Sequence, residues 1–351
     1  MTRAVRPRTV AVIGATGAVG REALERLHRR KFPVGELRAI ASHRSAGGTL
    51  PFAGGQVTVQ ALEEAAIRGV EVAILAADAE TSREWAPRLV KAGAVVVDNS
   101  SAFRMDPGVP LVVPEINGEE LQRGPALVAN PNCTTIISLM AAAPLHRSFG
   151  LRRITACSYQ AVSGAGLPAM QELEGQARQW AAGEQVQAKV FRRPTLFNVF
   201  PHDSALLPDG SNEEETKLVK ESRRILGLPE LRVSVTCVRV PVRRAHAVAL
   251  HLEFERPVEP EAAREVLSRS EGVQLIDERA GAPADPLMAA EGDAVLVSRI
   301  RRDPGAPEGH GLALWTVGDQ LLKGAALNAI QIAEGLLRDG PTYRSALQTD
   351  K

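Results

Sequence analysis

A cysteine stands at the start of an apolar segment in ANPNCTTIIS, residues 129–138. Pro131 is expected to end a preceding strand, and Asn132 is a residue type that caps helix N-termini. Cys133 would then lie in the first turn of a helix, where backbone N–H groups and the helix dipole favour a thiolate. The same N–H groups could hold an oxyanion on an acyl carbon bound to the sulfur. The pattern therefore indicates a nucleophilic thiol.

The other cysteines lie in different surroundings. Cys157 and Cys237 fall inside strand patterns and are expected to pack as small apolar residues, as most free cysteines do. Three cysteines at wide spacing, with no CxxC motif and no Cys/His cluster, predict neither a disulfide framework nor a metal site.

A nucleophilic thiol needs an acid/base partner, and the chain has seven histidines. Surface-like, loop or strand contexts surround six of them: His28, His43, His146, His202, His251 and His310. His246 follows VRVPVRRA, where Pro241 interrupts a strand and the chain turns. The pattern alone leaves His246 as one candidate for the catalytic base among several histidines.

A glycine-rich turn, GATGAVG at residues 14–20, follows the β-branched run Thr9–Ile13. Its spacing lets the backbone turn tightly and approach a pyrophosphate at a helix N-terminus. Such a turn can also be purely structural. Its position between a strand and the amphipathic segment REALERLHRR favours dinucleotide binding.

The end of the second expected strand, Leu37–Ala41, bears on the choice of dinucleotide. An NAD site needs an acidic residue there for the ribose hydroxyls. This chain has ASHRSAGG, in which Ser42, Arg44 and Ser45 offer a cation and hydroxyls to a 2′-phosphate. The sequence therefore predicts NADP(H), with a solvated surface charge as the alternative for Arg44.

Strands and helices alternate in the first part of the chain, which predicts parallel βαβ units and an α/β sheet. The expected elements there are strands at 71–77, 93–100, 111–117 and 125–130 and a helix near 81–92. After residue 133 a helix is expected over 134–148 and a long strand over 151–163. The segments 231–242 and 245–255 alternate as half-buried antiparallel strands do. A helix at 259–270, loops at 281–286 and 303–311, and a last apolar helix at 321–338 that returns to the first domain complete the pattern.

Length and charge limit the class of protein. A chain of 351 residues is long enough for two domains. A formal net charge of +1 argues against binding to nucleic acid or to a membrane surface. No segment approaches the roughly 18–20 apolar residues of a membrane span. The apolar run Val10–Ile13 is too short for a signal peptide, so a cytoplasmic protein is expected.

The chain resembles the aspartate-β-semialdehyde dehydrogenase family nearly from end to end. The matching stretches, in the family's order, are AVIGATGAVG, VVVDNSSAFRMDPGVPLVVPEIN, ANPNCTTI, SYQAVSGAG, FNVFPH, EEETKLVKESRRILG, VRVPVRRAH and VGDQLLKGAALNAIQIAE. The resemblance implies an α/β fold with a Rossmann-like NADP-binding domain (1–132 plus 320–351) and a central α+β catalytic and dimerisation domain (133–319). It also implies a C-terminal helix that returns to the first domain, and a homodimer or homotetramer.

The family's functional residues carry over to positions of this chain. Cys133 resembles the nucleophile, His246 the general acid/base and Gln160 the residue that orients the substrate at the reacting carbon. The substrate-binding positions are Arg239 for the α-carboxylate, Glu214 for the ammonium, Arg104 and Lys217 for phosphate, and Asn132. The cofactor-contacting positions are Gly14, Thr16, Gly17, Ala18, Val19, Arg44, Ser45, Ser163, Gly164 and Gln320, and the family usually has Asn in place of Gln320.

The reaction implied by the resemblance has a small-molecule substrate. It is the NADPH-dependent reductive dephosphorylation of 4-phospho-L-aspartate to L-aspartate 4-semialdehyde through a thioester, in lysine, threonine and methionine biosynthesis. One alternative is an N-acetylglutamyl-phosphate reductase. Evidence against it comes from Asn132, Gln160 and the Glu214/Lys217 pair. That pair, at i and i+3, could also be a solvated salt bridge on a helix. A second alternative is a catalytically silent paralogue that acts as a binding or structural dimer.

One stretch departs from the family pattern. After EVAILAA the family usually has a Gly-Gly pair at the cofactor, whereas this chain has AADAETS, with Asp78 in that region. A carboxylate beside a cofactor phosphate is unfavourable by charge and by crowding. We therefore expect either a displaced loop or a weakened affinity for the cofactor.

Overall fold

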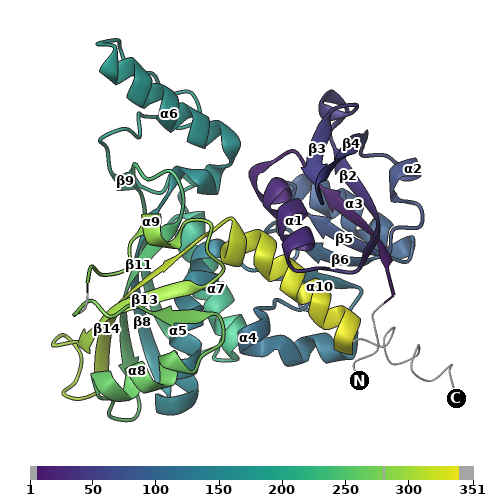
Figure 1. Ribbon diagram of the computed structural model, residues 1–351. Coiled ribbons are helices and arrows are strands. Elements are labelled where there is room, and N and C mark those ends of the chain that lie inside the picture. Colours follow the sequence, from purple (N-terminus) through teal and green to yellow (C-terminus); the bar gives the residue numbers. More distant parts are fainter. Residues whose placement is uncertain (1–5, 280, 340–351) are drawn as a thin grey trace, which may run out of the picture. The chain divides into compact units, whose positions relative to one another are not determined.

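The computed structural model describes residues 6–279 and 281–339 (Figure 1). The chain divides into two compact units. The first is built from the residues up to Pro131 and from Ala325 onward, and the second from Asn132–Gly324. Asn132 and Gln320 lie in the second unit, where Asn132 hydrogen-bonds to Glu214 and Gln320 to Ala245. In the described residues no helix is long and apolar enough to cross a membrane.

Among the described residues the first unit holds a seven-stranded sheet with the order β3-β4-β2-β1-β5-β6-β7. Its strands are β1 Arg8–Ile13, β2 Val34–Ala41, β3 Thr49–Phe52, β4 Gly55–Ala61, β5 Val72–Leu75, β6 Val95–Asp98 and β7 Leu127–Ala129. All neighbouring strands are parallel except the β3/β4 hairpin. Because β2 and β5 lie on opposite sides of β1, the strand order reverses at β1, which is where α/β sheets bind ligands.

The first unit has three α-helices of 12 or 13 residues and two of four residues among the described residues. They are α1 Ala18–Arg29, α2 Glu64–Ile67, α3 Ala79–Lys91, α4 Pro114–Asn117 and α10 Leu327–Asp339, with 3-10 helices at His43–Ser45 and Gly118–Arg123. The prediction of a strand over 111–117 is wrong. Leu111 makes only an isolated bridge to Ala129. Pro114 begins α4, because a proline at the first helical position loses no helical hydrogen bond.

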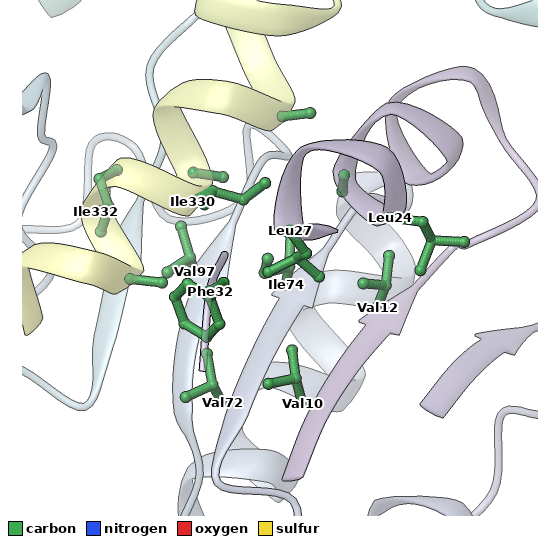
Figure 2. Close-up of a cluster of buried hydrophobic side chains, with 14 of the residues drawn as sticks. Val10, Val12, Leu24, Leu27, Phe32, Val72, Ile74, Val97, Ile330 and Ile332 are labelled. Carbon is green, nitrogen blue, oxygen red and sulfur yellow. The ribbon is translucent and has the colours of Figure 1, made fainter. Parts of the chain in front are cut away.

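The C-terminal helix completes the core of the first unit, as the sequence predicts. Figure 2 shows Ile330 and Ile332 of α10 together with Leu27, Phe32 and Val97. Ile330 and Ile332 are fully buried. A segment far along the chain thus covers apolar surface that the first strands and α1 present.

In the second unit, the described residues form another seven-stranded sheet, with the order β12-β13-β14-β11-β8-β10-β9. Its strands are β8 Leu151–Gln160, β9 Phe200–Pro201, β10 Arg232–Arg239, β11 His246–Phe254, β12 Val273–Leu275, β13 Val295–Arg302 and β14 Gly311–Gly318. Its helices are α5 Cys133–Phe149, α6 Leu167–Ala181, α7 Glu213–Leu226, α8 Pro260–Ser268 and α9 Pro286–Ala289, with a 3-10 helix at Val162–Ala165 and a π-helix at Leu322–Ala326.

The pairing of β10 differs from the prediction. β11 is antiparallel to β8, as expected, but β10 runs parallel to β8, with Arg239 opposite Gln160. An alternating pattern marks a half-buried strand and does not fix its direction. The chain also leaves β8 after Gln160 and turns into the 3-10 helix, so the predicted strand over 151–163 ends early. As a result β8 and β10 end at the same edge of the sheet, and β11 begins there.

We predict that Ile330→Ala lowers the free energy of unfolding of the first unit by about 2–5 kcal/mol, because it leaves a cavity under α10. Hydrogen exchange of β1 and β5 in urea measures this change. The matched control is Leu287→Ala, whose side chain is 87% exposed, with an expected change below about 0.5 kcal/mol. Equal exchange in the two variants would show that α10 is dispensable to this core.

Candidate active site

Cys133 is the first residue of α5, as the sequence predicts, and Asn132 caps the helix. The Asn132 side-chain oxygen accepts hydrogen bonds from the backbone N–H groups of Thr134 (2.9 Å) and Thr135 (3.2 Å). Gly324, in the π-helix, lies against Cys133, and a Cβ added to it would come within 2.8 Å of the Cys133 Cβ. The thiol is half-buried between a capped helix start and a residue that must be small.

A buried carboxylate, Glu214, connects three predicted site residues. Its Oε1 accepts hydrogen bonds from Asn132 Nδ2 (2.8 Å) and Gln160 Nε2 (3.1 Å). Its Oε2 accepts one from Lys217 Nζ (2.9 Å). Burial alone would raise the pKa of Glu214. Lys217, His202 and these hydrogen bonds outweigh burial and hold the pKa well below its usual range. Glu214 and Lys217 form an ion pair, as one alternative for these residues predicts. The Glu214 carboxylate of that pair is buried, however, and not solvated.

A second buried carboxylate supports the same helix start. Glu221, two helical turns after Glu214 on α7, accepts a hydrogen bond from the Asn132 backbone N–H at 2.6 Å. Glu221 was not predicted as a site residue. Its spacing of i+7 from Glu214 places both on one face of α7, which is the signal that could have identified it.

His246 is fully buried at the first residue of β11. Its Nδ1 accepts a hydrogen bond from the Ala161 backbone N–H at 3.0 Å, which places the proton of the neutral ring on Nε2. Burial and the nearby Arg239 lower the pKa of His246 to about 3. Nε2 has no hydrogen-bond partner within the described parts of the chain. The neutral ring therefore carries an N–H group that is available to a ligand.

Arg239, at the end of β10, is also buried. Its Nη1 donates to the Ala161 carbonyl oxygen (2.9 Å), and its Nη2 lies 2.8 Å from His202 Nε2. Asp203 Oδ1 lies 3.6 Å from Nη2. Burial lowers the pKa of Arg239, while Asp203, Glu214 and Cys133 oppose that shift. His202 and Asp203 were not predicted as site residues. They follow β9, which has only two residues and gives no strand pattern.

Three predicted cofactor positions lie beside His246. A Cβ added to Gly164 would come within 3.2 Å of His246 Nε2 and 3.3 Å of Arg239 Nη1. Gln320 accepts a hydrogen bond from the Ala245 backbone N–H (2.9 Å) and donates one to Ser163 Oγ. The longer amide at residue 320 thus connects the loop before His246 to the 3-10 helix that contains Ser163 and Gly164.

Cys237 packs as predicted. It is fully buried in β10, and burial raises the pKa of its thiol to about 12. Cys157 is half-buried in β8. Of the three cysteines, only Cys133 combines partial exposure with a helix N-terminus, and none of the three forms a disulfide. Within the described residues no group of three or more His, Cys, Asp or Glu side chains is arranged to hold a metal ion.

The glycine turn of the first unit lies where the strand order reverses. Gly14 has φ +82°, and a Cβ there would come within 2.2 Å of the Ala76 carbonyl oxygen. A Cβ on Gly20 would come within 2.2 Å of the Gly14 carbonyl oxygen. Gly17 is the N-cap of α1 and supplies no side-chain cap, so the backbone N–H groups of the first turn, including Ala18 and Val19, face no capping side chain. These features fit a dinucleotide pyrophosphate.

Arg44 and Ser45 follow β2 in a 3-10 helix. β2 pairs with β1 up to Ile13, so this helix lies past the same edge of the sheet as the glycine turn. Arg44 is exposed, and no ion pair involves it in the described part of the chain. Its position is compatible with a ligand phosphate.

Asp78 is the N-cap of α3, and its side chain accepts a hydrogen bond from the Thr81 backbone N–H at 2.8 Å. This hydrogen bond lowers the pKa of Asp78, so the residue keeps its charge near neutral pH. The Ala76 N–H donates to the Ile13 carbonyl oxygen at 2.7 Å. The hydrogen bonding of β5 to β1 therefore continues as far as residue 76, next to the glycine turn.

Arg104 is buried in the first unit. Its Nε donates to the Asn130 carbonyl oxygen and its Nη2 to the Asn99 carbonyl oxygen, both at 2.9 Å. These bonds orient the guanidinium at the ends of β6 and β7. Lys217, the other predicted phosphate ligand, belongs to the second unit.

Comparison with known proteins identifies the family. Residues 9–124 match the description "Semialdehyde dehydrogenase, NAD binding domain", and residues 142–323 match "Semialdehyde dehydrogenase, dimerisation domain". The aspartate-semialdehyde dehydrogenase of a Synechocystis species is 48% identical over 95% of this chain and 98% of its own. That of Aquifex aeolicus is 44% identical over 94% and 98%. The crystal structure of aspartate semialdehyde dehydrogenase II from Vibrio cholerae, 42% identical, has a TM-score of 0.91 over 95% of this chain and 99% of its own. The chain therefore belongs to the aspartate-semialdehyde dehydrogenase family of oxidoreductases.

Proposed function

We propose that the chain catalyses the NADPH-dependent reductive dephosphorylation of 4-phospho-L-aspartate to L-aspartate 4-semialdehyde, with Cys133 as the covalent carrier. One observation carries this proposal. Asn132, the neighbour of Cys133, and Gln160 both donate hydrogen bonds to the same buried carboxylate, that of Glu214. The structure of the Vibrio cholerae relative is described as a complex with aspartate semialdehyde, which supports the choice of substrate.

Acylation uses the helix start. The Cys133 thiolate attacks the carbonyl carbon of the acyl phosphate, a C–S bond forms, and the carbon–oxygen bond to phosphate breaks. The leaving phosphate takes the electron pair of that bond. Arg104 and Lys217 are the cations proposed to bind it. The N-terminus of α5 favours the thiolate before attack.

NADP(H) fits the first unit on the evidence of its glycine turn and open helix start. The residues that would hold it are Gly14, Thr16, Gly17 and the first turn of α1, with Arg44 and Ser45 at the 2′-phosphate. When bound, NADPH supplies the hydride that reduces the thioester. Ser163 and Gly164 are proposed as further contacts, and Gln320 acts through Ser163.

His246 acts as a hydrogen-bond donor in this scheme. Because Ala161 fixes Nδ1 as an acceptor, the neutral ring presents Nε2–H to the oxygen that gains negative charge in the tetrahedral state. When this state collapses, the carbonyl reforms, the C–S bond breaks and Cys133 leaves as a thiolate. The predicted role as a base towards the thiol needs a lone pair on Nε2. That role requires the other tautomer, which gives up the Ala161 hydrogen bond.

Recognition of a free amino acid follows from the charges of the site. Arg239 has a planar fork that suits the α-carboxylate. Glu214 keeps its charge and suits a substrate ammonium, whereas an N-acetylated substrate has no charge at that nitrogen. Gln160 is proposed to orient the reacting carbon. The charge of Glu214 therefore favours aspartyl phosphate over the N-acetylglutamyl alternative.

The match to a dimerisation domain over residues 142–323 supports a homodimer or homotetramer. A cytoplasmic location is part of the same proposal, which the three reduced cysteines support.

Cys133→Ala should abolish phosphate-dependent NADP⁺ reduction with L-aspartate semialdehyde, because no acyl carrier remains. Cys157→Ala is the matched control and should keep wild-type turnover, with circular dichroism confirming that both variants fold. The wild type is assayed in parallel with N-acetylglutamate semialdehyde and with no aldehyde. Measurable turnover by Cys133→Ala, or a preference for the N-acetylated substrate, would overturn the proposed function.

His246→Ala should lower kcat by about 10²–10³-fold, the usual scale for the loss of one donor to a developing oxyanion. His246→Gln should lose less, because its amide N–H can replace the donor. Since the pKa of His246 is about 3, its ring stays neutral in the assay range and should add no acidic limb to the pH profile of kcat. A loss below about tenfold in His246→Ala would remove this residue from the mechanism. Equal losses in the two variants would refute the donor role.

Asp78→Asn should bind NADPH about threefold more tightly than the wild type, the scale of one exposed charge a few ångström from a phosphate. Asn keeps an acceptor for Thr81 N–H, whereas Asp78→Gly also removes the side-chain cap, at a cost of about a few tenths of a kcal/mol. Glu84→Gln, a charge removal further along α3, serves as the control. Fluorescence titration measures the affinities, and equal values for wild type and Asp78→Asn would exclude the charge effect.

A further inference from the structure

We propose that His202 is the positioning residue of Arg239: its neutral ring accepts a hydrogen bond from the guanidinium and holds it in the orientation that binds the substrate α-carboxylate. The proposal rests on the proposed function, because that function assigns Arg239 to the carboxylate.

The hydrogen bond has only one possible direction. Arg239 Nη2 lies 2.8 Å from His202 Nε2, and a guanidinium has donors only. Nε2 must therefore be the acceptor, and the ring proton lies on Nδ1. Nδ1 is 3.2 Å from Ser204 Oγ, which can accept that proton's hydrogen bond. The Ser204 backbone N–H also points at Nδ1, at 3.2 Å, and donating to it needs the opposite tautomer. The shorter contact with a permanently charged guanidinium outweighs that longer, neutral hydrogen bond, so the ring proton lies on Nδ1.

His202 is fixed through its backbone and through the partner of its ring, Ser204. The His202 backbone N–H donates to the Cys237 carbonyl oxygen at 2.8 Å, which extends the pairing of β9 with β10. Ser204 Oγ also accepts a hydrogen bond from the Glu214 backbone N–H at 3.2 Å. His202 thus joins the N-terminus of α7 to the end of β10. Its Nε2 is thereby held in place to accept the hydrogen bond from Arg239.

The remaining contacts of Arg239 leave a fork for a ligand. Nη1 donates one hydrogen to Ala161, and Nη2 donates one to His202. Each terminal nitrogen has a second N–H; Asp203 Oδ1 lies 3.6 Å from Nη2, beyond the length of a strong hydrogen bond, so a substrate carboxylate would compete with Asp203 there. Phe191 lies with its ring centroid 5.3 Å from the guanidinium carbon. Two N–H groups on adjacent nitrogens suit a bidentate carboxylate. Without His202, Nη2 would lose the partner that sets the plane of this fork.

Protonation of His202 would reverse the interaction. The charged groups around the ring are Glu214 and Lys217 on α7, Arg239 on β10 and Asp203 beside it. Burial lowers the pKa of His202 below its ordinary value of about 6.5, so the ring is neutral at pH 7 to 8. As the pH falls through that lowered pKa, Nε2 gains a proton, the acceptor is lost, and a second cation faces Arg239.

The test compares His202→Leu with His202→Gln, because Gln can offer an amide oxygen but cannot titrate. With L-aspartate semialdehyde, phosphate and NADP⁺, His202→Leu should raise KM by about tenfold or more, the scale of a hydrogen bond to a charged group, with kcat changed far less. His202→Gln should restore most of the affinity. Wild-type KM should rise towards acid pH, and this acid limb should be absent in His202→Gln.

His28→Leu and His28→Gln are matched controls on an exposed face of α1 and should leave KM unchanged. An unchanged KM in His202→Leu, equal impairment of the two His202 variants, or the same acid limb in His202→Gln would each overturn the proposal. If His202→Leu does not fold, His202→Gln and its pH profile still decide the matter. Failure here leaves the Cys133→Ala result intact, whereas failure of the proposed function appears as wild type inactive on this substrate or as turnover by Cys133→Ala.

Discussion

A buried carboxylate on α7, Glu214, is the constraint on which the catalytic site depends. An ionised carboxylate in a protein interior is unfavourable unless it is hydrogen-bonded and paired. Hydrogen bonds from Asn132, Gln160 and Lys217 meet that requirement. Each of these residues also has a proposed role in binding or orienting the substrate. The same charge that could receive a substrate ammonium therefore holds the start of α5, the end of β8 and α7 together. Catalytic geometry and local stability share one group.

The hydrogen bonds around Ala161 show how one short backbone segment sets two side chains. Its N–H fixes the tautomer of His246, and its carbonyl oxygen orients Arg239. A backbone group cannot change its protonation state and is little affected by substitution. The ring and the guanidinium are therefore aimed by parts of the molecule that are the same in any sequence with this backbone.

Much of the fold and part of the site could be predicted from the sequence. The cap at Asn132, the helix that begins at Cys133, the βαβ order and the return of the C-terminal helix all follow from local patterns or from the resemblance. The parallel pairing of β10 with β8 could not be predicted, because alternation looks the same in both directions. Pro114 starts a helix in a segment whose apolar residues resemble a strand. His202 could not be predicted because its role depends on a contact with Arg239, distant in sequence, whereas Glu221 shares a helix face with Glu214 and only its contact with Asn132 was beyond the sequence pattern.

In the second sheet, the paired strands β11 and β14 have the site at one end and a loop at the other. His246 pairs with Gly318 at the site, whereas Glu253 pairs with Gly311 at the other end of the same two strands. The loop between Arg302 and Gly311 joins β13 to β14 at that distant end. A one-residue change of length within β10 or β11 would turn Arg239 or His246 to the opposite face of the sheet. The loop between Arg302 and Gly311 lies at the opposite end of these strands from Arg239 and His246, so the register that the site depends on is set elsewhere in the chain.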